Sequence, residues 1–269
     1  MTITQTPPPV SPPAAGPALI SRKRRVFGAV RFAGVTKRFP DGTQALAPVD
    51  LEIGPGEFVS VVGPSGCGKS TLLRVASGLS RPSAGKVEVI AEHIGYVFQD
   101  ATLLPWRTVR RNVELLMELD GIPRKDRRVR AQEAIDLVGL TGTEAKYPRA
   151  LSGGMRMRVS LARCLTMAPE VMLFDEPFGA LDEITRERMN DEVLRLFKER
   201  EFCGLFITHS VSEAVFMSSR VVVMSGRPGR IVAEFDIPFD YPRSPQLRYD
   251  PEFAQLAGRV SAALKAGHS

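Results

Sequence analysis

One stretch of this chain decides its fold: Gly63-Pro64-Ser65-Gly66-Cys67-Gly68-Lys69-Ser70, which follows the apolar run 58–62 and leads into Thr71. An apolar run, a glycine-rich turn and a helix-forming run, in that order, are typical of a strand, a phosphate-binding loop and a helix. The glycines allow successive backbone N–H groups to surround a phosphate chain, and the helix presents the positive end of its dipole. Lys69 can reach the β- and γ-phosphates, and the Ser70 hydroxyl can ligate Mg²⁺. The stretch therefore predicts a nucleoside triphosphate site.

The composition is that of an ordinary globular protein, with 43% hydrophobic and 25% charged residues among 269. This length suits one large α/β domain, or a core with a subdomain. No stretch approaches the roughly 18 apolar residues that span a bilayer, and none resembles a signal peptide, so we expect a cytoplasmic protein. The three cysteines lie far apart, without the paired spacing of a metal site or a disulfide framework, which fits a reducing compartment.

The net charge of +6 is concentrated at the start of the chain. Residues 22–25 are all basic, residues 1–25 contain no acidic residue, and removing these four charges from +6 leaves +2 over residues 26–269. The globular part therefore has no nucleic-acid footprint, and we expect no nucleic-acid partner. Residues 1–26 are rich in proline and are predicted to be a disordered tail. Its basic cluster has two interpretations, a solvated tail or a segment attracted to anionic lipid.

The rest of the chain alternates between strand and helix patterns, which predicts an α/β fold. Residues 107–165 carry helical periodicity with few strand signals, and we interpret them as a helical insertion. A further helix is predicted around residues 184–200, where apolar side chains at helical spacing mark a face that packs on the core. Strands are predicted at residues 30–32 (an edge strand), 49–53, 58–62, 87–90, 94–98, 171–174, 205–208 and 220–224.

Two carboxylates, Asp175 and Glu176, follow the apolar strand 171–174. Ligands of open α/β sheets bind beyond the carboxyl ends of the strands, so Asp175 is expected to hold Mg²⁺ together with Ser70. Glu176, one residue further, can orient the attacking water or accept its proton. The alternative interpretation is structural, with the two acids capping the next helix.

A second glycine turn, Ser152-Gly153-Gly154, precedes another helix-forming stretch. A Ser-Gly-Gly turn at a helix N-terminus is again suited to binding an anion. Glycine pairs are common in turns, so the motif alone is weak evidence. Its position 23 residues before Asp175, on a helix that leads into that strand, makes it diagnostic.

Taken together, these motifs resemble those of the ATP-binding subunits of ABC transporters, over about residues 28–265. The phosphate loop is similar to Walker A, Ser152-Gly153-Gly154 to the signature, and Asp175-Glu176 to Walker B. Further motifs match in order: Phe39 at the adenine-stacking position, Gln99 of the Q-loop, residues 180–182 of the D-loop and His209 of the switch. Met155 departs from the pattern, because the common signature ends in Gln.

The resemblance implies a P-loop NTPase (RecA-like) core with an antiparallel β subdomain and an inserted α-helical subdomain. The implied divisions are the tail 1–26, the ATPase domain 27–240 with its helical subdomain at about 100–165, and a C-terminal helical tail, 241–269. It implies ATP and Mg²⁺ as ligands, bound in a head-to-tail homodimer in which each signature contacts the partner's γ-phosphate. Implied catalytic residues are Glu176, His209 and Lys69; implied metal ligands are Ser70, Gln99 and Asp175. Implied nucleotide contacts are Phe39, Gly63, Pro64, Ser65, Gly66, Cys67, Gly68, Lys69, Ser70, Thr71, Gln99, Ser152, Gly153 and Gly154.

Within that family, segments 99–106, 175–182, 213–216 and 227–231 resemble the nitrate/sulfonate/taurine group of bacterial importers. About 45 residues follow the last predicted strand, too few for the regulatory β-domain of sugar-importer ATPases. The resemblance implies a peripheral ATPase on the cytoplasmic face of the inner membrane, bound to permease subunits and served indirectly by a solute-binding protein. The alternatives are a soluble ABC ATPase of the cluster-assembly type and an exporter subunit.

Trp106, the only tryptophan, follows the Q-loop segment. One interpretation is core packing. The other is that Leu104, Pro105 and Trp106 help to form the groove that receives a permease helix.

Overall fold

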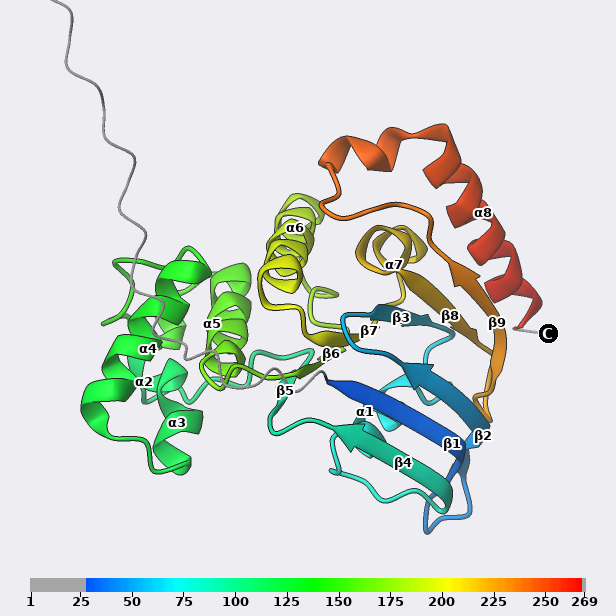
Figure 1. Cartoon of the computed structure of the whole chain (residues 1–269), viewed down its shortest axis with the longest axis horizontal. Coiled ribbons are helices and arrows are strands. Elements are labelled where there is room, and N and C mark those ends of the chain that lie inside the picture. The colour runs from blue at the N-terminus through cyan, green and yellow to red at the C-terminus, as the bar shows by residue number, and fades with distance from the viewer. Residues whose placement is uncertain (1–27, 268–269) are drawn as a thin grey trace, which may run out of the picture.

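A computed structural model describes residues 28–267, and the predicted tail 1–26 lies outside the described residues. A six-stranded sheet runs through the centre of the molecule (Figure 1). Its first five strands are parallel and the last is antiparallel. In spatial order the strands are β5 (Ile94–Val97), β6 (Val171–Asp175), β7 (Cys203–Ile207), β3 (Phe58–Val62), β8 (Arg220–Met224) and β9 (Ile231–Asp236).

The central strands are apolar throughout because both faces of the sheet are covered. In β6, Met172 and Phe174 belong to one apolar core, and Val171 and Leu173 belong to the other. The first core contains side chains of α6 (Glu183–Arg200), α7 (Val211–Met217) and α8 (Pro251–Ala266). The second contains side chains of α1 (Lys69–Ala76). The apolar face predicted within 184–200 is buried in the first core, which confirms its role in packing.

A second, antiparallel sheet covers α1 from the other side. Its order is β2 (Gln44–Ile53), β1 (Ala29–Arg38), β4 (Ala84–Ile90). The prediction of an edge strand at residues 30–32 is wrong, because Val30 pairs with both Ile53 of β2 and Val89 of β4. The alternation of apolar and polar residues at 30–32 shows only that one face of the strand is buried and the other exposed. A central strand of an antiparallel sheet has the same pattern as an edge strand.

The predicted helical insertion forms a group of helices beside β5, to the left in Figure 1. The group joins the first core through α5, which packs against both α6 and β5. Within residues 28–267, no helix has both the length and the apolar character needed to cross a membrane. The members are α2 (Val109–Val113), α3 (Leu115–Leu119), α4 (Arg124–Leu137) and α5 (Gly153–Leu165).

Strand β9 was missed by the sequence analysis, which ended the strands at residue 224. It pairs antiparallel with β8 at the edge of the large sheet. Its residues alternate between half-buried and exposed, with Glu234 and Asp236 facing solvent, so it lacks the continuous apolar run of the central strands. Fewer residues therefore follow the last strand than the sequence suggested, and α8 accounts for 16 of them.

Candidate nucleotide site

Four of the predicted motifs follow four neighbouring strands of the large sheet. The order β5-β6-β7-β3 places the carboxyl ends of these strands at one edge. Gln99 follows β5, Asp175 ends β6, His209 follows β7, and the phosphate loop 63–68 follows β3. The strand order therefore brings together motifs that are up to 146 residues apart, as expected for a ligand site of an open α/β sheet.

The phosphate loop is closed around its own lysine. Lys69 is only 5% exposed, and its Nζ donates to the carbonyl oxygens of Gly63 at 2.8 Å and Pro64 at 2.9 Å. Gly68 precedes α1 with φ +111°, a backbone conformation that side chains rarely allow. A Cβ there would also lie 2.8 Å from the carbonyl oxygen of Ala45. The loop thus carries a buried positive charge at the start of a helix, which suits a phosphate chain.

Asp175 is held by two hydroxyl groups. Ser70 Oγ donates to its Oδ1 at 2.7 Å, and Tyr96 Oη donates to its Oδ2 at 3.1 Å. Burial and the neighbouring carboxylate raise the pKa of Tyr96 well above its usual value, so its hydroxyl remains a donor. A carboxylate beside a serine hydroxyl provides the hard oxygen ligands that Mg²⁺ prefers. The sequence analysis missed Tyr96, and only the pairing of β5 with β6 could have placed it next to Asp175.

Glu176 lies between two nitrogen-bearing side chains. Its Oε1 is 3.8 Å from Lys69 Nζ, and its Oε2 is 3.5 Å from His209 Nδ1. Its backbone has φ +46°, an uncommon conformation for a residue with a side chain, which costs on the order of 1–3 kcal/mol. A hydrogen bond of 3.0 Å from its N–H to the carbonyl oxygen of Ile207 holds the turn. The fold thus keeps a carboxylate in a strained position beside the phosphate loop, as is common at active sites.

The side chain of His209 is 55% exposed, more than that of Glu176, and neighbouring residues hold the conformation of its loop. Thr208 Oγ1 donates to the buried carboxyl group of Glu213 and accepts from the N–H of Ser210 at 3.0 Å. Ser210 Oγ in turn accepts from the N–H of Glu213 at 3.2 Å and caps α7. Burial raises the pKa of Glu213 above its ordinary value. Glu213 is a further support of the site to which sequence reasoning gave no role of its own.

The Ser152–Gly154 turn lies elsewhere, at the start of α5 in the helical group (Figure 1). Ser152 is exposed, and its Oγ caps α5 by accepting from the N–H of Met155 at 3.3 Å. A Cβ on Gly154 would lie 2.8 Å from Thr185 at the start of α6, so the turn contacts the D-loop region of its own chain. Met155 packs its half-buried side chain against the first core, which an apolar side chain suits.

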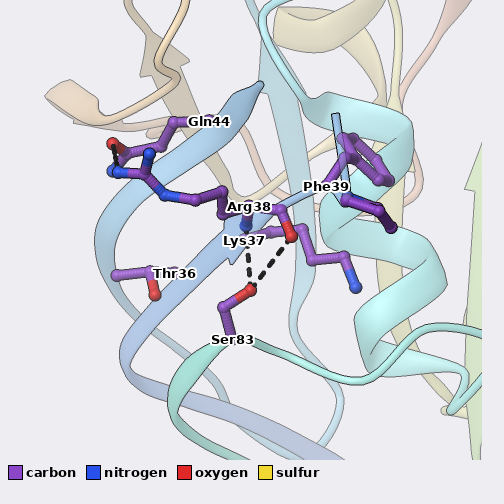
Figure 2. Close-up of a pocket in the computed structure, with 7 residues that line it drawn as sticks. Thr36, Lys37, Arg38, Phe39, Gln44 and Ser83 are labelled. Carbon is purple, nitrogen blue, oxygen red and sulfur yellow. Dashed lines mark hydrogen bonds between the residues drawn. The ribbon is translucent and has the colours of Figure 1, made fainter. Parts of the chain in front are cut away.

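Phe39 and Gln99 occupy more open positions. Figure 2 shows Lys37 and Phe39 pointing to the same side of the chain, while Arg38 points away toward Gln44. The Phe39 ring is 38% exposed at a pocket of about 490 Å³, with Lys37 Nζ 5.6 Å from its centroid. An aromatic face open to a pocket can stack on a base. Gln99 is exposed two residues beyond the end of β5, at the same sheet edge as Asp175.

A phosphate loop after a parallel strand, with two consecutive acids at the end of a second parallel strand of the same sheet, defines the class of P-loop nucleoside triphosphatases. Residues 46–179 match the family model described as ABC transporter. A nitrate import ATP-binding protein of Synechocystis sp. is 43% identical over 82% of this chain and 88% of its own. An aliphatic sulfonates import ATP-binding protein of Mesorhizobium japonicum is 41% identical over 93% of this chain and 92% of its own.

The solved structures include the dimer of an ATP-binding cassette in a post-hydrolysis state bound to ADP and Pi. It is 32% identical to this chain, covers 78% of it and all of its own length, and superposes with a TM-score of 0.68. The protein belongs to the ABC transporter family, as one of its ATP-binding ATPase chains. The predicted family, fold class and ATPase class are confirmed.

Proposed function

We propose that this protein is the ATP-hydrolysing subunit of a bacterial importer of a small solute such as nitrate, a sulfonate, taurine or a pyrimidine. The observation that carries this proposal is the Glu176 carboxylate, held between Lys69 and His209 at the edge of the sheet. The names of the relatives support the direction of transport, since both are import ATP-binding proteins.

In the proposed reaction the chain binds the phosphates through Lys69 and through the backbone N–H groups of the phosphate loop and Thr71, with Pro64 shaping the loop but donating no N–H. Glu176 orients the attacking water and accepts its proton, because its carboxylate faces the phosphate loop. His209, whose Nδ1 lies 3.5 Å from Glu176 Oε2, would contact the γ-phosphate. Ser70, Asp175 and Gln99 would hold Mg²⁺, which neutralises charge on the phosphate oxygens when bound.

We further propose a head-to-tail homodimer in which Ser152, Gly153 and Gly154 of one copy contact the γ-phosphate bound by the other. Support comes from the position of the turn on α5, in the helical group, and from the dimeric cassette among the similar structures. The N-terminus of a 13-residue helix favours an anion. Hydrolysis would then require the dimer to close.

The permease contact is proposed at Trp106. The interpretation of this residue as core packing is wrong, because its side chain is 71% exposed. It lies with Arg111, Glu118 and Tyr147 around a surface pocket of about 510 Å³ in the helical group. An exposed aromatic side chain with polar neighbours is typical of an interaction site. Binding there to permease subunits would place the protein at the cytoplasmic face of the inner membrane, with a solute-binding protein acting indirectly.

The test is to capture partners of tagged Glu176→Gln protein from detergent-solubilised membranes with Mg-ATP and to identify them by mass spectrometry. Glu176→Gln is expected to bind ATP and to hydrolyse it at least ~100-fold more slowly, because the general base is lost. A polytopic permease should be recovered, and its solute-binding protein should identify the solute.

The matched control is the double variant Glu176→Gln/Trp106→Ala, which should bind ATP equally and recover much less permease. Equal recovery by both variants would remove Trp106 from the interface. Recovery of soluble partners alone would contradict the transport function and favour a cytosolic ABC ATPase.

A further inference from the structure

The turn between β8 and β9, residues 225–230, lies against the outside of the phosphate loop. In the sequence, the overlapping residues 227–231 resemble the importer group. In the structure it contacts three separate parts of the chain: the phosphate loop, the start of β2 and the end of α8. We call residues 225–230 the brace.

Arg227 connects the brace to the phosphate loop. Its Nε and Nη2 both donate to the carbonyl oxygen of Gly66, at 3.1 and 3.0 Å. The Gly66 carbonyl and the Cys67 N–H belong to one planar trans peptide and point in opposite directions. With the carbonyl held by the arginine, that N–H faces the inside of the loop, where it donates to Pro64 O at 3.3 Å. Arg227 therefore sets the orientation of an amide in the loop that receives the phosphates.

Gly229 brings the brace into direct backbone contact with the loop. A Cβ at this position would lie 2.1 Å from the carbonyl oxygen of Cys67, so only glycine can approach so closely. Its N–H donates to Ala45 O at 2.9 Å, and its carbonyl accepts from Ala47 N–H at 3.0 Å. The brace is thus tied to β2 on one side and packed on the loop on the other.

The end of the C-terminal helix holds the far side of the brace. The N–H of Gly226 donates to the carbonyl oxygen of Gly267, the residue after α8, at 3.1 Å. Within the brace, the Ser225 hydroxyl donates to Gly226 O at 2.9 Å, with Pro228 O further away at 3.4 Å, and Ser225 Oγ accepts from Arg230 N–H at 3.2 Å. Hydrogen bonds therefore tie the brace to the end of α8 at Gly226 and to the phosphate loop at the next residue, Arg227.

We propose that Arg227 is a positioning residue for nucleotide binding: it holds the phosphate loop, from its outer side, in the shape that accepts the phosphates of ATP. The inference rests on the proposed function, because it assigns regulation of affinity to the same site. Arg227 contacts the loop backbone and no reacting atom, so it acts on binding rather than on the hydrolysis step.

The experiment compares Arg227→Ala with the full-length wild-type chain for the Kd of ATP and of ADP, and for kcat at saturating ATP. We expect both Kd values to rise about three- to tenfold, since the lost bonds are charge-assisted but exposed, while kcat stays within about twofold. Arg227→Lys should recover part of the affinity, because an ammonium can make one of the two bonds. Hydrogen exchange of the phosphate-loop amides should quicken in Arg227→Ala.

The control is Arg230→Ala, in the same exposed turn, whose hydrogen bonds come from its backbone. It should leave both Kd values unchanged. Unchanged affinity in Arg227→Ala, or a fall in kcat at unchanged affinity, would overturn the proposal. The assay measures nucleotide binding by the chain alone, so a failure to capture a permease would contradict the proposed function and leave this result standing.

Discussion

The phosphate loop and the Ser152–Gly154 turn are two glycine turns at the N-termini of helices, yet they have opposite surroundings. The first encloses a lysine that is 5% exposed, and it faces the two acids at the end of β6 and the histidine after β7. The second has an exposed serine and contacts the D-loop region of its own chain. One half of the proposed site is therefore assembled within the chain, while the other half faces outward, where a second molecule can complete it.

The strongest test of this comparison mixes two inactive variants. Lys69→Ala removes the charge of the first half, and Ser152→Asp places a negative charge in the second while keeping a residue that caps helices well. Each variant alone should lose about 100-fold or more of its ATPase activity. In a mixed dimer, one site combines an intact phosphate loop with an intact signature, so a 1:1 mixture should recover up to about a quarter of the wild-type rate.

Mixed dimers would be verified with two affinity tags, and activity measured in the doubly purified sample. Circular dichroism of each variant serves as the control for folding. If verified mixed dimers remain as inactive as the separate variants, the two halves do not meet across a dimer.

A second prediction concerns the hydrogen bond from Tyr96 to Asp175, in the half of the site that contains the phosphate loop. Tyr96→Phe removes the hydroxyl that donates to Asp175 Oδ2, and leaves Ser70 as the remaining side-chain donor to that carboxylate among residues 28–267. We expect the Mg²⁺ concentration for half-maximal ATPase activity to change by about three- to tenfold, because a hydrogen bond to a charged group contributes about 1.5–3 kcal/mol before screening. Tyr147→Phe, a half-exposed tyrosine of the helical group, is the matched control and should match the wild type. Equal Mg²⁺ dependence in both variants would assign Tyr96 to packing alone.

The sequence was sufficient to predict the family, the fold class and the ATPase class, because the order and spacing of the motifs carry that information. The alternating apolar pattern of β1 could not reveal its central place, since a strand pattern reports buried faces and not neighbours. Tyr96 and Arg227 reach Asp175 and Gly66 across 79 and 161 residues. Such contacts depend on strand order and register, which local patterns do not specify. The domain limits and the roles of individual site residues remain predictions.

The smallest effect on activity is expected from substitution of Glu213, whose buried side chain supports the loop of His209. Its Oε1 and the Oδ1 of neighbouring Asn190 are buried oxygens without a hydrogen-bond partner in residues 28–267. Burial raises the pKa of Glu213, against the weaker opposing influence of Thr208, Asn190, Arg186 and His209. The folded state therefore favours the protonated carboxyl. Its contribution to stability is present below 4.5, the ordinary pKa of a glutamate in the unfolded chain, and is lost as the pH rises through the higher folded value.

Glu213→Gln keeps a neutral side chain of the same shape at every pH, with a donor for Asn190 and an acceptor for Thr208. Its stability relative to the wild type should rise as the pH increases above 4.5 and then level off, measured as Tm at successive pH values. ATPase activity should stay within about twofold, because the Thr208 contact survives. Glu213→Ala, which leaves the Thr208 hydroxyl without that acceptor, should lose stability across the whole range. A Gln variant that is less stable than the wild type at neutral pH would mean that Glu213 is ionised and that its charge stabilises the loop of His209. In that case the half of the site that is assembled within the chain would depend on the charge of Glu213 as well as on the charges of Lys69, Asp175 and Glu176.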